Sequence, residues 1–141
     1  MSETSIVKTV FIDAPREAVW EYLTDKDKLG EWYHHAEANL ADGETYTLYR
    51  IDDEGQNDSM ISGRVLEINP PSKLVTTFVI DAFQGNETTV TWVLEDAAGG
   101  TRLHLTHDGI AAAMGDSALP LLMGIDGGWD AHLGVLRSAA W

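Results

Sequence analysis

Apolar residues recur at intervals of three and four positions over the last quarter of the chain, from Ser117 to Trp141. This spacing predicts an amphipathic helix, with Asp126, Asp130 and Arg137 on the side opposite the apolar face. The apolar positions are Leu122, Ile125, Trp129, Leu133, Leu136 and Ala140. A single amphipathic helix needs a partner for this face, and a sheet is the only other element here that is large enough.

Capping residues indicate where the helices begin. Asp116 or Ser117 can cap the C-terminal helix, and Pro120 is tolerated because it falls in the first turn. Asp13 and Asp25 are the expected caps of two short helices near the N-terminus. The apolar faces of these short helices are Val19, Trp20 and Leu23 in the first, and Leu29, Trp32 and Tyr33 in the second.

The rest of the chain has the pattern of an antiparallel meander. Asp42-Gly43, Pro70-Pro71 and Gly99-Gly100 are turn signals between segments rich in β-branched and aromatic residues. The predicted strands are Ser5–Asp13, Ala36–Leu40, Glu44–Asp52, Ser59–Asn69, Lys73–Ile80, Glu87–Glu95 and Thr101–His107. The last two alternate cleanly, which directs Val90, Trp92, Leu103 and Leu105 towards the helix.

Composition narrows the class of protein and its partners. The 141 residues are most simply one domain covering residues 1–141, with an ordinary hydrophobic content of 44%. A formal net charge of −14 repels phosphate backbones and anionic lipids, so we expect neither nucleic acid nor membrane as a partner. The absence of cysteine and of a signal peptide fits a cytoplasmic protein.

The sequence offers few residues in patterns typical of catalysis, metal binding or cofactor binding. Nucleophile-elbow, zinc-protease and phosphate-loop motifs are absent, so we predict no catalytic residues and no cofactor. The pairs His34-His35 and His104/His107 point to opposite sides of extended chain, which argues against a metal site. The acidic run Asp52-Asp53-Glu54 lies in a polar loop and is expected to be solvated.

Three stretches together resemble a known family. Phe11 to Trp20 resembles the opening of START-like (Bet v-type, SRPBCC) helix-grip domains, and Gly63 to Leu74 resembles their mid-sheet hairpin. Leu105 to Gly109, followed by Gly128-Trp129, is similar to the end of one branch of that superfamily. This branch comprises the homologues of the activator of the heat-shock protein 90 ATPase. The co-chaperone that names it carries a separate N-terminal domain that this sequence does not resemble, so its function is not transferred with the name.

The resemblance implies an α+β helix-grip fold. In this fold a curved antiparallel sheet wraps around a long C-terminal helix, and two short helices follow the first strand. Such domains usually hold an apolar cavity between sheet and helix, which agrees with the helix and meander predicted above. The residues expected to line it are Trp32, Tyr46, Leu48, Phe78, Val90, Trp92, Leu103, Leu105, His107, Met123 and Trp129.

Each of these candidates has a structural alternative. The aromatic residues could be plain core packing, which is also the expectation for Trp20, and Met123 could fill a gap in the core. His107 could be a polar group at the end of the cavity facing His132, or it could be hydrogen-bonded to backbone near Asp108-Gly109.

Two charged residues in the predicted strands also bear on the cavity. Arg50 and Glu67 could face inward, where Arg50 would orient a polar group of a ligand or the two would form an ion pair. The predicted strands within residues 59–80 are apolar on nearly both faces, so the sequence does not show which of their side chains face inward. These alternatives therefore stay open.

Three functions follow from these expectations. The first is binding of a small hydrophobic or aromatic molecule without catalysis, favoured by a roomy apolar cavity. The second is an enzyme acting on a polyketide-like or aromatic substrate, which requires converging polar groups. The third is an interaction module that contacts a chaperone or forms a homodimer, which requires an exposed apolar patch.

Overall fold

A computed structural model of the chain describes residues 5–51, 54–55, 57–114 and 118–140. The strands are β1 Ile6–Ile12, β2 His35–Ala36, β3 Thr45–Ile51, β4 Asn57–Asn69, β5 Lys73–Phe78, β6 Thr88–Ala97 and β7 Gly100–Asp108. The helices are α1 Arg16–Thr24, α2 Lys26–Trp32, α3 Ile110–Met114 and α4 Ala118–Ala140, with a 3-10 turn η1 at Asp81–Phe83.

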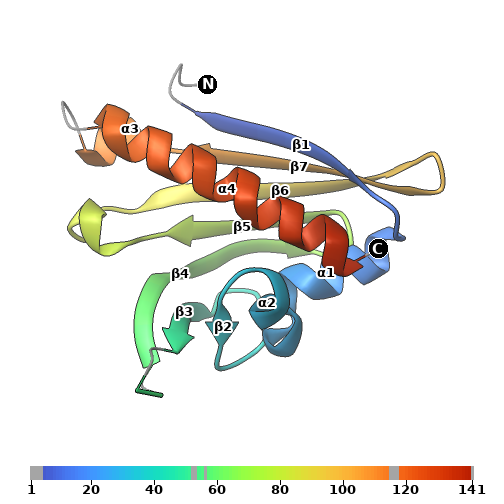
Figure 1. Cartoon of the computed structure of the whole chain (residues 1–141), viewed down its shortest axis with the longest axis horizontal. Coiled ribbons are helices and arrows are strands. Elements are labelled where there is room, and N and C mark those ends of the chain that lie inside the picture. Colours follow the sequence, from blue (N-terminus) through green and yellow to red (C-terminus); the bar gives the residue numbers. More distant parts are fainter. Residues whose placement is uncertain (1–4, 52–53, 56, 115–117, 141) are drawn as a thin grey trace.

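The strands form one antiparallel sheet in the order β1-β7-β6-β5-β4-β3-β2. Helix α4 runs diagonally across one face of this sheet, and α1 and α2 close its end beside β2 and β3 (Figure 1). The predicted α+β helix-grip fold is therefore confirmed. None of the helices in the described ranges is long and apolar enough to cross a membrane.

The strand register explains which side chains face α4. In the β6–β7 pair, Val90 lies opposite His107 and Trp92 lies opposite Leu105. Burial alternates along both strands, as the sequence pattern predicts, because successive side chains point to opposite faces of a sheet. Residues on the inner face pack against the buried side of α4, where Trp129, Leu133 and Leu136 lie.

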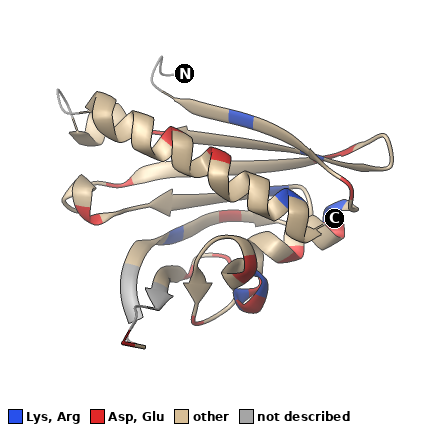
Figure 2. Ribbon diagram, in the orientation of Figure 1, with Lys and Arg blue, Asp and Glu red and all other residues tan. Residues whose placement is uncertain are grey.

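An ion-pair network ties the edge strand β1 to α4. Lys8 Nζ lies 2.8 Å from Asp126 Oδ1 and 2.9 Å from Asp130 Oδ1. The two carboxylates are one helical turn apart and would repel each other without this shared cation. In Figure 2 the ribbon of α4 carries acidic positions in red, and β1 carries a basic position in blue.

Several local predictions are confirmed and others are wrong. Asp25 caps α2, since its side chain accepts hydrogen bonds from the backbone N–H groups of Asp27 and Lys28. Pro120 lies in the first turn of α4, and Trp20 is buried in the core. Asp13 does not cap α1, because Pro15 occupies the N-cap position.

The strand expected at Ala36–Leu40 is much shorter than predicted. Only His35–Ala36 pairs with β3, and the chain then turns so that the Leu40 N–H donates to the Thr24 carbonyl. This hydrogen bond to the end of α1 replaces the ladder that a longer strand would have made. The predicted caps of α4, Asp116 and Ser117, lie outside the described residues, as do Asp52, Asp53 and Trp141.

Candidate functional site

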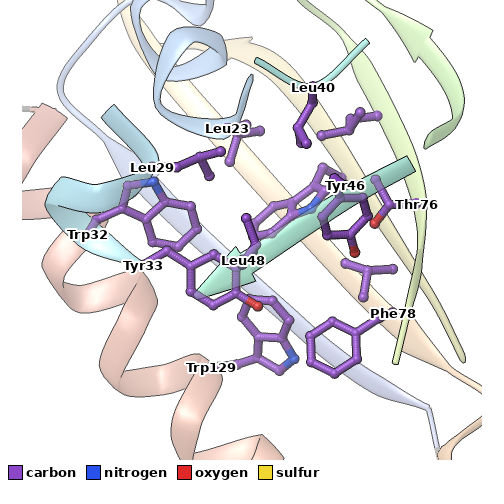
Figure 3. A pocket seen from close by; sticks show the side chains of 13 residues that line it. Leu23, Leu29, Trp32, Tyr33, Leu40, Tyr46, Leu48, Thr76, Phe78 and Trp129 are labelled. Atoms are coloured by element: carbon purple, nitrogen blue, oxygen red, sulfur yellow. The ribbon is translucent and has the colours of Figure 1, made fainter. Parts of the chain in front are cut away.

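An inner cavity lies between the sheet, α2 and α4. Its free volume is about 30 Å³, which is room for one or two water molecules. Figure 3 shows aromatic and aliphatic side chains from both sides converging on it. The lining residues are Leu23, Leu29, Trp32, Tyr33, Leu40, Tyr46, Leu48, Leu74, Thr76, Phe78, Val90, Trp92 and Trp129.

Packed aromatic rings are the reason that the inner cavity is so small. Trp129 meets Trp92 edge-on, with ring centroids 5.5 Å apart, and stacks on Tyr33 at 5.4 Å. Tyr33 in turn stacks on Trp32 at 4.9 Å. Trp32 is held in place because its indole N–H donates to the Tyr22 carbonyl at 2.7 Å. In this part of the predicted cavity the aromatic side chains therefore pack against one another as core and leave little free space.

A second, outer cavity opens on the other side of the same aromatic wall. It has a volume of about 180 Å³, and three rings, those of Tyr33, Phe78 and Trp129, line both cavities. The other lining residues come from β4, from α4 and from the segments that follow α2 and β5. They are His34, Met60, Ile61, Ile80, Ile125, Gly128 and His132.

Two tyrosine hydroxyls lie at the aromatic wall. In Figure 3 the Tyr33 and Tyr46 hydroxyls both point into the space beside Leu48 and Phe78. Burial raises the pKa of Tyr46 to about 12 against the lowering effect of its hydrogen bond with Thr76, and its O–H also donates to the Thr77 carbonyl. Burial, with a smaller contribution from Tyr46, also raises the pKa of Tyr33 well above 10. Both hydroxyls are therefore neutral at physiological pH.

His107 forms part of a buried hydrogen-bond chain behind this wall. The Trp129 indole N–H donates to Nδ1 of His107 at 3.1 Å, so the proton of the neutral ring is on Nε2. That N–H donates to Thr88 Oγ1 at 2.8 Å, and the threonine hydroxyl donates to the Phe78 carbonyl at 2.7 Å. Burial lowers the pKa of His107 to about 4, although Asp108 raises it slightly.

These contacts correct both expectations for His107. It is fully buried, lines neither cavity, and bonds to side chains rather than to backbone near Asp108-Gly109. His132 lies elsewhere: its described ring contacts are Tyr33 at 4.8 Å and His34 at 5.3 Å. Its Nδ1–H donates to the Trp32 carbonyl at 3.4 Å, and burial lowers its pKa although this hydrogen bond raises it.

The structure brings most of the predicted residues together. The predicted residues that line the inner cavity are Trp32, Tyr46, Leu48, Phe78, Val90, Trp92 and Trp129. Leu103 and Leu105 are buried in the core but line neither cavity. Met123 is a wrong prediction, because its side chain is 68% exposed. It follows Leu122 by one position, a rotation of about 100° that carries it from the apolar face to solvent.

Charged side chains do not contribute to the described cavity walls. The alternatives left open for Glu67 are decided against an inward orientation, because its side chain is half-exposed and its Oε2 lies 3.6 Å from Lys73 Nζ. The side chain of Arg50 lies outside what the structure describes. None of the residues found to line the inner or outer cavity is Lys, Arg, Asp or Glu. Within the described part of the chain there is also no group of three or more His, Cys, Asp or Glu residues that could hold a metal ion.

Sequence reasoning missed most of the outer cavity. Tyr33 and Ile80 were expected inside the second short helix and the strand Lys73–Ile80, but α2 ends at Trp32 and β5 at Phe78, so these two residues and His34 lie in connecting segments. The helical spacing predicts Ile125 only as part of the apolar face of the C-terminal helix. Its position at the edge of that face, beside Gly128, is the one signal that could have placed it at an opening.

The sequence of this chain matches one protein family over most of its length. The family model described as "Activator of Hsp90 ATPase homolog 1-like protein" matches residues 13–140. The chain belongs to this family. No curated protein is similar enough in sequence to match this member of the family.

Solved structures of low sequence identity share the fold of this chain. CalU16 from Micromonospora echinospora is 24% identical with a TM-score of 0.76, covering 96% of this chain and 75% of that chain. PFC0360w, described as an HSP90 activator from Plasmodium falciparum, is 24% identical with a TM-score of 0.75, covering 96% and 94%. The Aha1 dimer from Colwellia psychrerythraea is 18% identical with a TM-score of 0.75, covering 96% and 95%.

Proposed function

We propose that this protein binds a small hydrophobic or aromatic molecule in the outer cavity, without catalysing a reaction on it. The observation that carries the proposal is the cavity of about 180 Å³ bounded by Tyr33, Phe78 and Trp129. An apolar cavity of about 150 Å³ is large enough to bind benzene in other proteins. The outer cavity is therefore matched to a single aromatic ring.

The proposal places the ligand differently from the sequence prediction. The inner cavity holds too little space for any organic molecule while the Tyr33 ring stays stacked between Trp32 and Trp129. A ligand would instead contact the outer side of this wall, with Met60 adapting to its shape. Of the predicted residues, Phe78 and Trp129 remain contacts, and the other inner-cavity residues support the wall from behind.

Thermal unfolding against a panel of single-ring compounds tests the proposal. The panel contains benzene, toluene, p-xylene and p-cresol, with tryptophan fluorescence as a second readout because Trp129 is at the wall. A ligand present at 100 times its Kd stabilises the native state by about 2.7 kcal/mol, which raises Tm by roughly 8 °C for a chain of this size. Absence of a shift with every compound would contradict ligand binding.

An enzymatic role receives less support. Acid–base catalysis needs two or more titratable groups with suitable pKa values converging on a substrate. The hydroxyls of Tyr33 and Tyr46 are neutral, burial also lowers the pKa of His132, and His107, which has a strongly lowered pKa, is buried behind Trp129 and lines neither cavity. These features favour binding over reaction.

A protein-interaction role is a second candidate, favoured by one observation on α4. Leu119 and Met123 are 66% and 68% exposed on the first turns of this helix. Similar structures are described as a dimer and as an HSP90 activator, so a homodimer or a chaperone contact would be the expected partner. Light scattering of wild type and Met123→Lys tests the homodimer, which the charged residue should weaken.

A further inference from the structure

We propose that the ligand of the outer cavity is an uncharged single-ring aromatic alcohol or phenol whose hydroxyl group donates a hydrogen bond to Nε2 of His132. This inference rests on the ligand-binding function proposed above and specifies its chemistry. It follows from the charge, the hydrogen-bonding state and the shape of the cavity wall.

The charge of the wall excludes ionic ligands. The lining residues described for this cavity include no Lys or Arg to pair with an anion and no Asp or Glu to pair with a cation. The chain as a whole carries a formal net charge of −14, which further disfavours an anion such as a carboxylate. Moving an unpaired charge from water into this apolar wall would cost several kcal/mol, so the ligand is neutral.

The hydrogen-bonding state of His132 sets the polar group of the ligand. Its Nδ1–H donates to the Trp32 carbonyl, which fixes the neutral ring in the tautomer with a bare Nε2. None of the described residues donates to this Nε2 atom. The partial burial of the ring keeps it neutral, because desolvation lowers its pKa. His132 therefore offers an acceptor, and its natural partner is an O–H group.

The shape of the wall favours one aromatic ring next to that hydroxyl. His132 contacts the Tyr33 ring edge-on at 4.8 Å, and Tyr33 stacks against Trp129 at 5.4 Å. A ligand ring in contact with Tyr33 and Trp129 can thus place a substituent at His132. Aromatic pairs gain stabilisation in offset or edge-to-face contact beyond the area they bury. Ile80 and Ile125 also line the cavity and provide apolar contacts for the ligand ring.

Four closely matched compounds test this inference by calorimetric titration. p-Cresol carries the donor, p-xylene replaces the hydroxyl by a methyl group, 4-methylanisole caps the oxygen, and p-toluate carries a negative charge. We expect p-cresol to bind about tenfold more tightly than p-xylene or 4-methylanisole, the gain typical of one hydrogen bond. We expect p-toluate to bind more weakly than all three.

Two variants show whether His132 is the source of the preference. His132→Phe keeps a ring but removes the acceptor, so the preference for p-cresol over p-xylene should disappear while p-xylene still binds. His104→Gln is the control, because His104 lies on the face of the sheet that points away from α4 and the outer cavity. Its ring bonds to Glu95 and Thr9. It should leave the preference unchanged.

Each outcome is informative. If p-xylene binds as tightly as p-cresol, or if His132→Phe keeps the preference, the inference about the hydroxyl is wrong while ligand binding stands. If p-toluate binds most tightly, the neutral-ligand argument is wrong. If none of the four compounds binds to the wild type, both the inference and the proposed function fail.

Discussion

Trp129 donates its indole N–H to Nδ1 of His107 at 3.1 Å, so a buried histidine fixes one of the three aromatic rings that line both cavities. Because Nδ1 is the acceptor, protonation of His107 would place two donors against each other. The orientation of the cavity wall therefore depends on a neutral imidazole. This dependence leads to the first prediction.

Acidification should destabilise the fold through His107. Its pKa is about 4 in the folded chain against 6.5 for the free group, so below pH 6.5 the unfolded chain binds a proton that the folded chain excludes. Stability is thus lost as pH falls from 6.5 towards 4, by ~3 kcal/mol over the whole window. Urea unfolding of the wild type and His107→Gln at pH 7 and 4.5 measures this contribution, which the variant should lack. An equal pH dependence in both proteins would contradict it.

Thr88 should be essential to the same hydrogen-bond chain. Its hydroxyl accepts from His107 and donates to the Phe78 carbonyl, and its side chain is buried. Thr88→Val keeps the shape but leaves the buried Nε2–H of His107 without an acceptor and removes the hydroxyl bond to the Phe78 carbonyl, which should cost about 1–3 kcal/mol of unfolding free energy. Thr91→Val, on the opposite face of β6, is the matched control and should change stability by less than about 0.5 kcal/mol. Similar losses of unfolding free energy in the two variants would show that these hydrogen bonds add no stability beyond that of an ordinary threonine on the sheet.

Lys8 should stabilise the contact between β1 and α4. Its side chain is only 17% exposed and bridges Asp126 and Asp130, so Lys8→Met removes the shared cation and leaves two like charges one turn apart. We expect a loss of about 1 kcal/mol in low salt that shrinks as salt screens the repulsion. Lys26→Met is the control, since Lys26 is more exposed and, among the residues that the structure describes, forms an ion pair with its neighbour Asp27 alone. Urea unfolding in 20 mM and 500 mM salt measures this loss. A loss of the same size at both salt concentrations would contradict an electrostatic role of Lys8.

The fold could be predicted from the sequence because its main elements have clear periodicity. The three-four spacing around Trp129 and Leu133 identifies both α4 and its buried face, and the alternation through Trp92 and Leu105 identifies the inner face of the sheet. The prediction failed at His35–Ala36, where a hydrogen bond from Leu40 to the end of α1 ends the strand early. This hydrogen bond forms only when the helix and the segment after the strand pack together, so local sequence patterns do not predict it.

The candidate site was less predictable for two physical reasons. Tyr33 and His34 lie in the segment between α2 and β2, so the helical spacing that groups Tyr33 with Leu29 and Trp32 does not give the direction of its side chain. The partners of His107 are 19 positions before it and 22 after it, and only the pairing of β6 with β7 and the packing of α4 bring them together. The sequence could identify His107 as inward-facing, but its hydrogen-bond partners depend on tertiary packing.

Gly128 allows the outer cavity to be filled without disturbing the fold. A Cβ atom added at Gly128 meets nothing within 4 Å, and the residue lines the outer cavity. Gly124 lies one turn earlier on α4, also has open space around an added Cβ, and does not line either of the two described cavities. Replacing either glycine by leucine improves helix propensity by up to about 1 kcal/mol, so both variants should fold.

The most direct test of ligand binding in the outer cavity is therefore the thermal shift produced by p-xylene and p-cresol in Gly128→Leu and Gly124→Leu. We predict that each compound stabilises Gly124→Leu as much as it stabilises the wild type, and that Gly128→Leu, with its cavity filled, shows no shift with either compound. An undiminished shift in Gly128→Leu would contradict binding in this cavity and locate the ligand elsewhere on the protein.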